Sequence, residues 1–167
     1  MKPKRITKKI INNFACNPKT GVLTWNVNKE RIKIGNVAGT IGVDGYRLVG
    51  LEGITYYAHR ICYCIYHGKQ PIVIDHINGD KSDNRLANLR SCSKSQNTMN
   101  AKMKSNNTSG HTGVTWCKRS EKWYAQLMSK GRYMGFGLHA DIKDAVEARK
   151  QAEIKYFGKY RYKIEDR

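Results

Sequence analysis

The side chains best suited to chemistry lie in one stretch of the chain, from Ile72 to Asn100, which reads IVIDHINGDKSDNRLANLRSCSKSQNTMN. In it a carboxylate and an imidazole, Asp75 and His76, stand side by side after a short run of β-branched residues. Neighbouring side chains on an extended strand point to opposite sides, so the two groups cannot share one role. We therefore expect one of them to hold a metal ion while the other faces a different part of the same site.

Hydrolysis of a phosphodiester is a reaction that these groups fit. A water must be deprotonated and aimed, the phosphate charge must be offset and the leaving 3′ oxygen must be stabilised, and a divalent cation can do the last two. A neutral imidazole such as that of His76 can take the proton from the water. Asn97 can complete the metal ligation through its amide oxygen, and Asn88 can hold the His76 ring by a hydrogen bond. Asn84 remains an alternative to Asn88 in that second role.

The surrounding pattern predicts a β-hairpin followed by a helix. Residues 72–74 are a β-branched strand, residues 78–80 have the composition of a turn, and residues 86–91 are the predicted return strand. A capping-box pattern then predicts a helix from about residue 94 to residue 103, which carries Asn97. Two further carboxylates in the loop are interpreted as turn residues, although either is a rival metal ligand: Asp80 and Asp83.

Upstream, the sequence predicts a small antiparallel scaffold and one helix. The helix runs from Ala58 to His67, with Gly68 where a C-terminal cap belongs. On it, His59 is interpreted as a structural histidine and Arg60 as a supporting or phosphate contact. The other predicted elements are a short helix at 5–14, a strand at 22–25 and a hairpin formed by 46–49 and 51–57.

The composition favours a polyanionic partner. The 167 residues include 31 Lys and Arg against 13 Asp and Glu, which gives a formal net charge of +18. Nucleic acid is the commonest partner of such a chain, and a basic protein with no such partner is the alternative. No apolar run approaches the ~20 residues of a membrane span, and no apolar signal core follows the basic start. The five cysteines form no CxxC pair, which favours reduced thiols in the cytoplasm of a bacterial or infected host cell.

The central motifs together resemble an HNH endonuclease of the phage homing type. The segments that carry the resemblance are DHINGD at 75–80, DNRLANLR at 83–90 and QNTMN at 96–100. The lead-in TGVLTW, the later GY and the segment YAHRICYCIYHGKQP are also similar to the start of phage HNH proteins, so the similarity covers the chain from about Phe14 to Asn100.

The resemblance assigns roles to the residues of the centre. It implies a ββα-metal fold in which Asp75 and Asn97 bind Mg²⁺, with Mn²⁺ as the alternative metal. It also implies that His76 is the general base and that Asn88 orients it. Many family members have histidine where this chain has Asn97, and asparagine favours a hard cation over zinc. Two arginines are candidates to clamp the phosphate, Arg90 and Arg85.

The C-terminal third predicts a second basic module behind a linker at 101–112. Strand patterns at 113–117, 122–128 and 132–136 precede a helix that Asp141 caps and Gly158 ends. The pieces SGHTGVTW, KWYAQL, DAVEARKQAE and YFGKY resemble an APETALA2/ERF-type domain, in which a three-stranded sheet enters the major groove. Trp116 and Trp123 are either part of this surface or core residues under the helix.

We expect the DNA-binding face to combine basic and polar side chains of this module with basic residues nearer the centre. Positively charged groups offset phosphates, and arginine can also contact guanine edges. The candidate DNA-binding residues are Arg85, Lys102, Lys104, Thr115, Lys118, Arg119, Lys122, Trp123, Lys130, Arg132 and Tyr133.

The expected fold is α+β: an HNH ββα-metal domain with N-terminal antiparallel strands over residues 1–100, a linker at 101–112 and a three-stranded antiparallel sheet packed on one helix over 113–167. The expected function is a site-specific, divalent-metal-dependent endonuclease acting on double-stranded DNA. A monomer with one such site would nick one strand, and no obligate protein partner or membrane association is expected. A DNA-binding regulator with a degenerate HNH motif is the alternative, and RNA binding is a weaker one because no RNA-stacking signature is present.

Overall fold

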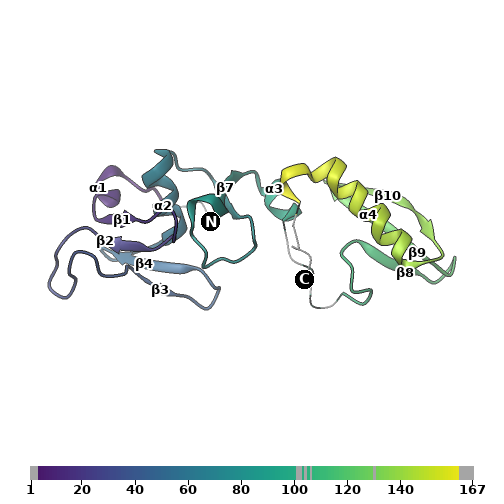
Figure 1. Cartoon of the computed structure of the whole chain (residues 1–167), viewed down its shortest axis with the longest axis horizontal. Helices are drawn as coiled ribbons and strands as arrows, with labels where there is room; N and C mark the ends of the chain where they lie inside the picture. Colours follow the sequence, from purple (N-terminus) through teal and green to yellow (C-terminus); the bar gives the residue numbers. More distant parts are fainter. Residues whose placement is uncertain (1–3, 101–102, 104, 106, 130, 162–167) are drawn as a thin grey trace. The chain divides into compact units, whose positions relative to one another are not determined.

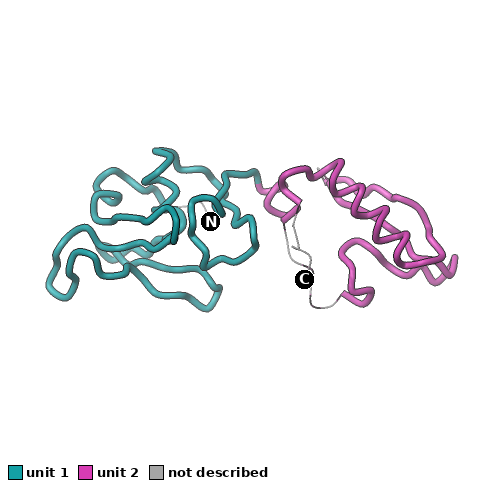
Figure 2. The backbone as a smooth tube through the Cα atoms, in the orientation of Figure 1, with its two compact units in different colours: residues 1–93 teal, residues 94–167 magenta. Residues whose placement is uncertain are grey.

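The structure is a computed structural model that describes residues 4–100, 103, 105, 107–129 and 131–161 (Figure 1). The chain divides into two compact units, residues 1–93 and residues 94–167 (Figure 2). Both units mix short helices with small antiparallel sheets, so the expected α+β class is confirmed. None of the helices in the described part of the chain is long and apolar enough to cross a membrane.

The first unit contains three small antiparallel sheets, and α2 lies against two of them. The sheets pair β1 with β2, order β3, β4 and β5 side by side, and pair β6 with β7. The elements are α1 (Lys8–Ile11), β1 (Phe14–Cys16), β2 (Leu23–Trp25), β3 (Thr40–Ile41), β4 (Arg47–Leu51), β5 (Ile54–Tyr57), α2 (Ala58–His67), β6 (Val73–His76), η1 (Leu86–Asn88) and β7 (Leu89–Cys92).

A single hydrophobic core holds the first unit together. Leu23 of β2, Val49 of β4 and Ile61 of α2 are fully buried in it. Ile74 of β6 and Leu89 of β7 belong to the same core, so the strands that carry the central motif are anchored to the scaffold. Burial of each large aliphatic side chain contributes about 1.5–3 kcal/mol to the stability of such a core.

The helix and the hairpin expected before the centre are both present. The helix α2 spans Ala58–His67, and Gly68 ends it in a left-handed conformation with φ 60°. The strands β4 and β5 are joined by a turn in which Glu52 and Gly53 both have positive φ. At the N-terminus the expected helix is shorter, because Phe14 leaves the helix to pair with Trp25 across β1 and β2.

The return strand of the central hairpin begins later than expected. The strands β6 and β7 pair antiparallel with Asp75 opposite Arg90 and His76 opposite Leu89. The residues just before β7 instead form the short 3-10 turn η1, which Arg85 starts by accepting from the backbone N–H of Asn88. A β-rich pattern alone does not distinguish such a turn from the first residues of a strand.

In the second unit one three-stranded antiparallel sheet packs on one long helix, as expected. The strands are β8 (Val114–Cys117), β9 (Lys122–Ser129) and β10 (Arg132–His139), in the order β10-β9-β8. The helix α4 (Ile142–Phe157) contacts all three strands. The unit also contains α3 (Lys94–Met99) and the 3-10 turn η2 (Gly158–Tyr160).

The helix α4 lies close to its sheet because small residues face the strands. Asp141 caps it by accepting from the backbone N–H of Lys143 at 2.8 Å, and Ala145 and Ala152 are buried against the sheet. Arg149 of the same helix is buried: it donates to the backbone oxygen of Thr112 and pairs with Glu153. A glycine at 113 makes room for this guanidinium, since a Cβ there would lie 2.5 Å from Arg149 Nε.

The division between the two compact units falls after Ser93. The helix α3 therefore belongs to the second unit, where Met99 packs against Leu127, Ala152 and Phe157. Four residues of the predicted linker at 101–112 lie outside the described residues: 101, 102, 104 and 106.

Candidate active site

The antiparallel pairing of β6 and β7 separates Asp75 and His76 onto opposite faces of the hairpin, as expected for neighbours on a strand. Asp75 faces Arg90 across the two strands, whereas His76 lies toward Asn84 and the rings of His59 and Tyr46. Only 5% of Asp75 and 4% of His76 is exposed. Burying two ionisable groups side by side costs free energy unless each is hydrogen-bonded or paired.

The imidazole of His76 is held by the side chain of Asn84. His76 Nε2 lies 3.1 Å from Asn84 Oδ1, and only 3% of Asn84 is exposed. An amide oxygen can only accept, so Nε2 carries the proton of the neutral ring and Nδ1 carries the lone pair. The sequence predicts Asn88 as the partner of His76, with Asn84 as the alternative, and in the structure Asn84 makes this contact.

Asn88 instead closes the loop between the two strands. Its Oδ1 accepts from the backbone N–H of Asn78 at 3.0 Å, and its Nδ2 donates to the backbone oxygen of Asp83 at 2.8 Å. The backbone N–H of Ile77 donates to the Asn88 carbonyl at 2.9 Å. Asn88 lies in η1 rather than on the return strand, which is why its side chain reaches into the loop instead of toward His76.

A cluster of rings surrounds His76 on its buried face. His59 of α2 lies edge-on to it with ring centroids 5.1 Å apart, and Tyr46 lies 5.2 Å from His59 and 5.8 Å from His76. Tyr57 closes the cluster at 5.5 Å from His59. The sequence indicated only a structural role for His59 and missed this neighbour, because α2 and β6 are brought together by the tertiary fold.

Burial keeps both imidazoles neutral. It lowers the pKa of His59 from 6.5 to about 3, helped by the nearby His76. Burial also lowers the pKa of His76, although the Asn84 hydrogen bond and the charge of Asp75 act in the opposite direction. A neutral imidazole at neutral pH is the form that a general base requires.

The carboxylate of Asp75 is paired with the guanidinium of Arg90. Arg90 Nε donates to Asp75 Oδ2 at 2.7 Å, and Nη2 lies 2.6 Å from the same oxygen. The two residues face each other across β6 and β7, so the pair also fixes the register of the hairpin. The sequence predicts that Arg90 contacts the phosphate of the substrate. In the structure its guanidinium pairs with Asp75, the predicted metal ligand.

The donor chemistry at Asp75 fits a hard divalent cation. Carboxylate and amide oxygens are the ligands that Mg²⁺ and Ca²⁺ prefer, and a carboxylate can accept from an arginine and a metal ion at once. The rival carboxylates are engaged in the loop: Asp80 accepts from Ser82, and Asp83 pairs with Arg85 at 2.6 Å. Among the described residues no group of three or more His, Cys, Asp or Glu side chains could hold a metal ion.

Asn97, the second expected metal ligand, lies on α3 in the second unit and is exposed. Its backbone oxygen accepts from the N–H of Asn100 at 3.3 Å. Its side chain lies on the surface of this short helix. Arg85, a candidate for phosphate or DNA contact, is exposed in the loop before η1.

The strand register divides the expected DNA-binding residues of the second unit between two faces. Thr115 pairs with Tyr124, Lys122 with Cys117 and Tyr133 with Met128, and these positions alternate with the buried ones, so they share the face away from α4. Tyr133 is 74% exposed there.

The remaining candidates lie around that face or away from it. Trp123 packs on the core beside α4 and contacts Trp116 with centroids 5.1 Å apart, so its core interpretation is confirmed. Arg132 begins β10 and is exposed, and two exposed basic residues occupy the turn between β8 and β9, Lys118 and Arg119. Three expected contacts lie outside the described residues: Lys102, Lys104 and Lys130.

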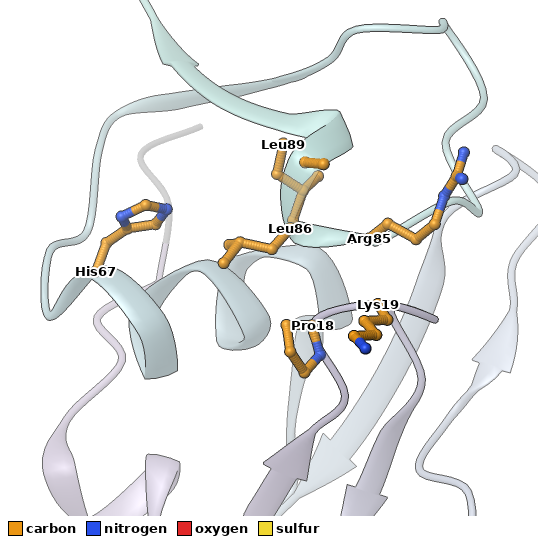
Figure 3. A pocket seen from close by; sticks show the side chains of 7 residues that line it. Pro18, Lys19, His67, Arg85, Leu86 and Leu89 are labelled. Carbon is orange, nitrogen blue, oxygen red and sulfur yellow. The ribbon is translucent and has the colours of Figure 1, made fainter.

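A shallow, mainly apolar pocket lies beside the loop that carries Asn84 (Figure 3). Its volume is about 610 Å³, and it is lined by Pro18, Lys19, His67, Arg85, Leu86, Ala87 and Leu89. The guanidinium of Arg85 donates two hydrogen bonds to Asp83, so the positive charge at the rim of the pocket is partly offset. The pocket shows where the turn between β1 and β2 meets the segment before β7.

Comparison with known proteins agrees with the motif. Residues 56–99 match the family described as HNH endonuclease, a range that includes α2, the β6–β7 hairpin and α3. A segment of 63 residues, 38% of this chain, is 36% identical to Protein 3.8 of Escherichia phage T7 and covers 52% of it. The chain thus spans about half the length of the curated relative it matches. No solved structure matches the chain. Residues 56–99 are therefore similar to HNH endonucleases.

Proposed function

We propose that the protein is a site-specific, divalent-metal-dependent DNA endonuclease of the HNH homing type, which hydrolyses a phosphodiester and nicks one strand at a time. One observation carries the proposal: a buried neutral His76, held by Asn84, stands next to a buried Asp75 inside the segment that matches the HNH family. Metal-assisted hydrolysis needs a ligand for the ion and a base for the attacking water, and these two residues can supply both groups.

The general base of this proposal is His76. Its lowered pKa leaves the ring neutral at physiological pH, ready to take the proton of the attacking water. Asn84 holds the ring and assigns its proton to Nε2. General-base catalysis of this kind contributes typically 10²–10⁴-fold to the rate.

Asp75 and Asn97 would hold the metal ion, Mg²⁺ or Mn²⁺, through oxygen atoms. When bound, the ion supplies charge that offsets the phosphate and stabilises the leaving 3′ oxygen. Arg90 keeps the Asp75 carboxylate oriented before the ion arrives. Arg90 or Arg85 would then hold a phosphate oxygen, and Arg85 is the more exposed of the two.

The second unit would target the nuclease to DNA in the manner of an APETALA2/ERF-like module. The proposal is supported by the three-stranded sheet on one helix and by the position of Thr115, Lys122 and Tyr133 on the face away from α4. Short strands with basic and aromatic side chains can offset phosphates and pack on sugars. The surplus of 31 Lys and Arg over 13 Asp and Glu favours such contacts along the duplex.

The test is a cleavage assay on a supercoiled plasmid library, in which nicked and linear products are resolved. We expect nicked circles with Mg²⁺ or Mn²⁺ and none with EDTA. We expect His76→Ala to lower the cleavage rate at least ~100-fold without loss of DNA binding, since it removes only the base. His111→Ala, which changes an exposed histidine of the second unit, is the matched control.

The outcomes separate the two functions expected from the sequence. Cleavage by His76→Ala at the wild-type rate would remove His76 as the base. A wild-type chain that binds DNA tightly but leaves every plasmid supercoiled with each metal would support the non-catalytic regulator instead.

A further inference from the structure

The turn between β1 and β2 is a preformed structure that docks on the loop carrying Asn84. Inside the turn, Asn17 Oδ1 accepts from the backbone N–H groups of Lys19 and Thr20 at 2.9 and 3.1 Å. The N–H of Gly21 donates to the Asn17 carbonyl at 2.8 Å, which closes the turn. These internal bonds favour one conformation of the turn.

Two contacts join this turn to the segment between Asn84 and Leu86. The backbone N–H of Leu86 donates to the Pro18 carbonyl at 3.0 Å. Gly21 is buried with φ +72°, and a Cβ placed on it would lie 2.3 Å from the carbonyl carbon of Asn84 and 2.4 Å from the nitrogen of Arg85. Figure 3 shows Pro18 and Lys19 on one side of the pocket, facing Leu86 and Arg85 on the other. Only a glycine allows the two backbones to approach so closely.

The peptide that Gly21 touches is the one that carries the partner of His76. Asn84 is 3% exposed, and its Oδ1 lies 3.1 Å from His76 Nε2. From the other side, Asn88 Nδ2 holds the carbonyl of Asp83, the residue before Asn84. The backbone of Asn84 is thus fixed between the loop clamp and the β1–β2 turn.

We propose that the β1–β2 turn, through Gly21, is a positioning element that holds Asn84 on His76 and so fixes the tautomer of the general base. The inference deepens the proposed function and rests on it for the role of His76. The chemistry is specific: with Nε2–H donated to Asn84, the lone pair of the neutral ring is on Nδ1. If Asn84 withdraws, the proton can occupy either nitrogen, and part of the population has the wrong tautomer for proton transfer.

The test compares two glycine substitutions with the same backbone strain. Gly21→Ala places a methyl group against the Asn84 backbone, whereas Gly53 has the same φ of +72° and no neighbour within 4 Å. The cost of forcing alanine into positive φ is therefore common to both variants, and only Gly21→Ala adds the collision. Tautomers are read from the nitrogen-15 chemical shifts of His76, which separate protonated from unprotonated ring nitrogens.

We expect Gly21→Ala to populate both tautomers of His76 and to lower kcat roughly 10- to 100-fold with KM unchanged. Gly53→Ala keeps the wild-type nitrogen shifts and kcat. In an Asn84→Ala background, Gly21→Ala lowers kcat no further, because the two changes act through one contact. Wild-type shifts and kcat in Gly21→Ala, or additive losses in the double variant, would overturn the proposal.

A second pair of variants keeps the test decisive if Gly21→Ala does not fold. Leu86→Pro removes the N–H that donates to Pro18, at a position preceded by the extended Arg85 with φ −53° and ψ 137°, which proline accepts. Leu86→Ala is its control for the lost side chain. Mixed His76 tautomers in Leu86→Pro alone support the proposal, and identical spectra for both variants oppose it. Because this readout needs no cleavage, it decides the role of the turn even if His76→Ala proves fully active.

Discussion

Single residues at the centre of the segment that matches HNH endonucleases are almost fully buried. His59, Asp75 and His76 are each at most 6% exposed, although all three can carry charge. In a site so buried, the protonation state of each group is set by its immediate neighbours rather than by solvent. Stability and activity should therefore depend on pH through these few side chains.

His59 should make the first unit acid-labile. Its pKa is about 3 in the folded chain against 6.5 for an ordinary histidine, so between these values the unfolded chain binds the extra proton. Stability is then complete above pH 6.5 and falls by about 1.4 kcal/mol for each pH unit below it, until the folded histidine also titrates. We expect His59→Phe to reduce this slope in urea unfolding measured from pH 7 to pH 4.

His67→Phe, at an exposed position on the same helix, is the control and should leave the slope unchanged. A slope identical to wild type in His59→Phe would mean that another group, such as His76, accounts for the acid lability.

Arg90 should be needed for stability as well as for catalysis. Replacing it by glutamine leaves the buried Asp75 carboxylate without its guanidinium, and breaking a buried pair costs about 3–5 kcal/mol. We expect Arg90→Gln to lower the melting temperature and Mg²⁺ to raise it again more than in the wild type, since a cation can replace the lost positive charge. Arg85→Gln, which breaks an exposed pair, should change the melting temperature little. If Mg²⁺ stabilised neither form, Asp75 would not be a metal ligand.

At the scale of elements, the sequence predicted best those whose ends carry local signals. The helix α2 ends at Gly68 and α4 begins at Asp141, because a glycine cap and an aspartate cap are determined by adjacent residues. The start of β7 was predicted too early, because the choice between a 3-10 turn and a strand depends on contacts with Pro18, distant in sequence.

The candidate site was predictable in its residue types but not in all its contacts. Strand alternation, which depends only on neighbouring residues, predicts that Asp75 and His76 lie on opposite faces of the hairpin. The partner of His76 does not, since a loop residue such as Asn84 is placed by the turn that docks on it rather than by any periodicity. The burial of Arg149 is not predictable from a helix pattern either, because that pattern cannot show that Gly113, in the turn before β8, makes room for a guanidinium.

The loop between β6 and β7 should depend on Asn88. Its amide forms two hydrogen bonds across the loop, to the N–H of Asn78 and the carbonyl of Asp83, and it is 7% exposed. Asn88→Ala leaves both backbone groups without this partner, at a cost of about 1–3 kcal/mol for a buried polar group. We expect faster proteolysis within residues 78–83 and a lower cleavage rate, with the exposed Asn26→Ala as control. Unchanged proteolysis would show that the loop is held elsewhere.

At the scale of the whole molecule, the helix α3 ties the HNH motif to the second unit. The family match ends at residue 99, the last residue of α3, yet Met99 packs on the core of the second unit. If Asn97 is a metal ligand, as proposed, the helix that carries it is stabilised by the core of the second unit.

Truncation at Lys104 should therefore impair more than targeting. It removes Leu127, Ala152 and Phe157, against which Met99 packs, so a helix of only six residues should unravel. We expect weaker DNA binding in a gel-shift assay and also a higher Mg²⁺ concentration for half-maximal nicking. The full-length variant Lys122→Ala should show only the weaker binding. Equal Mg²⁺ concentrations for half-maximal nicking by the truncated and full-length chains would show that α3 functions without the core of the second unit.

The packing of Met99 also bears on how modules of this kind can be exchanged between proteins. A joint placed in the low-complexity stretch after residue 100 would combine α3 with a foreign sheet and helix that lack its apolar partners. A joint after Ser93 would transfer α3 together with the core it packs on. Chimeric nucleases with a new sequence preference should therefore stay active when the junction lies before α3, even though that junction cuts through the HNH motif itself.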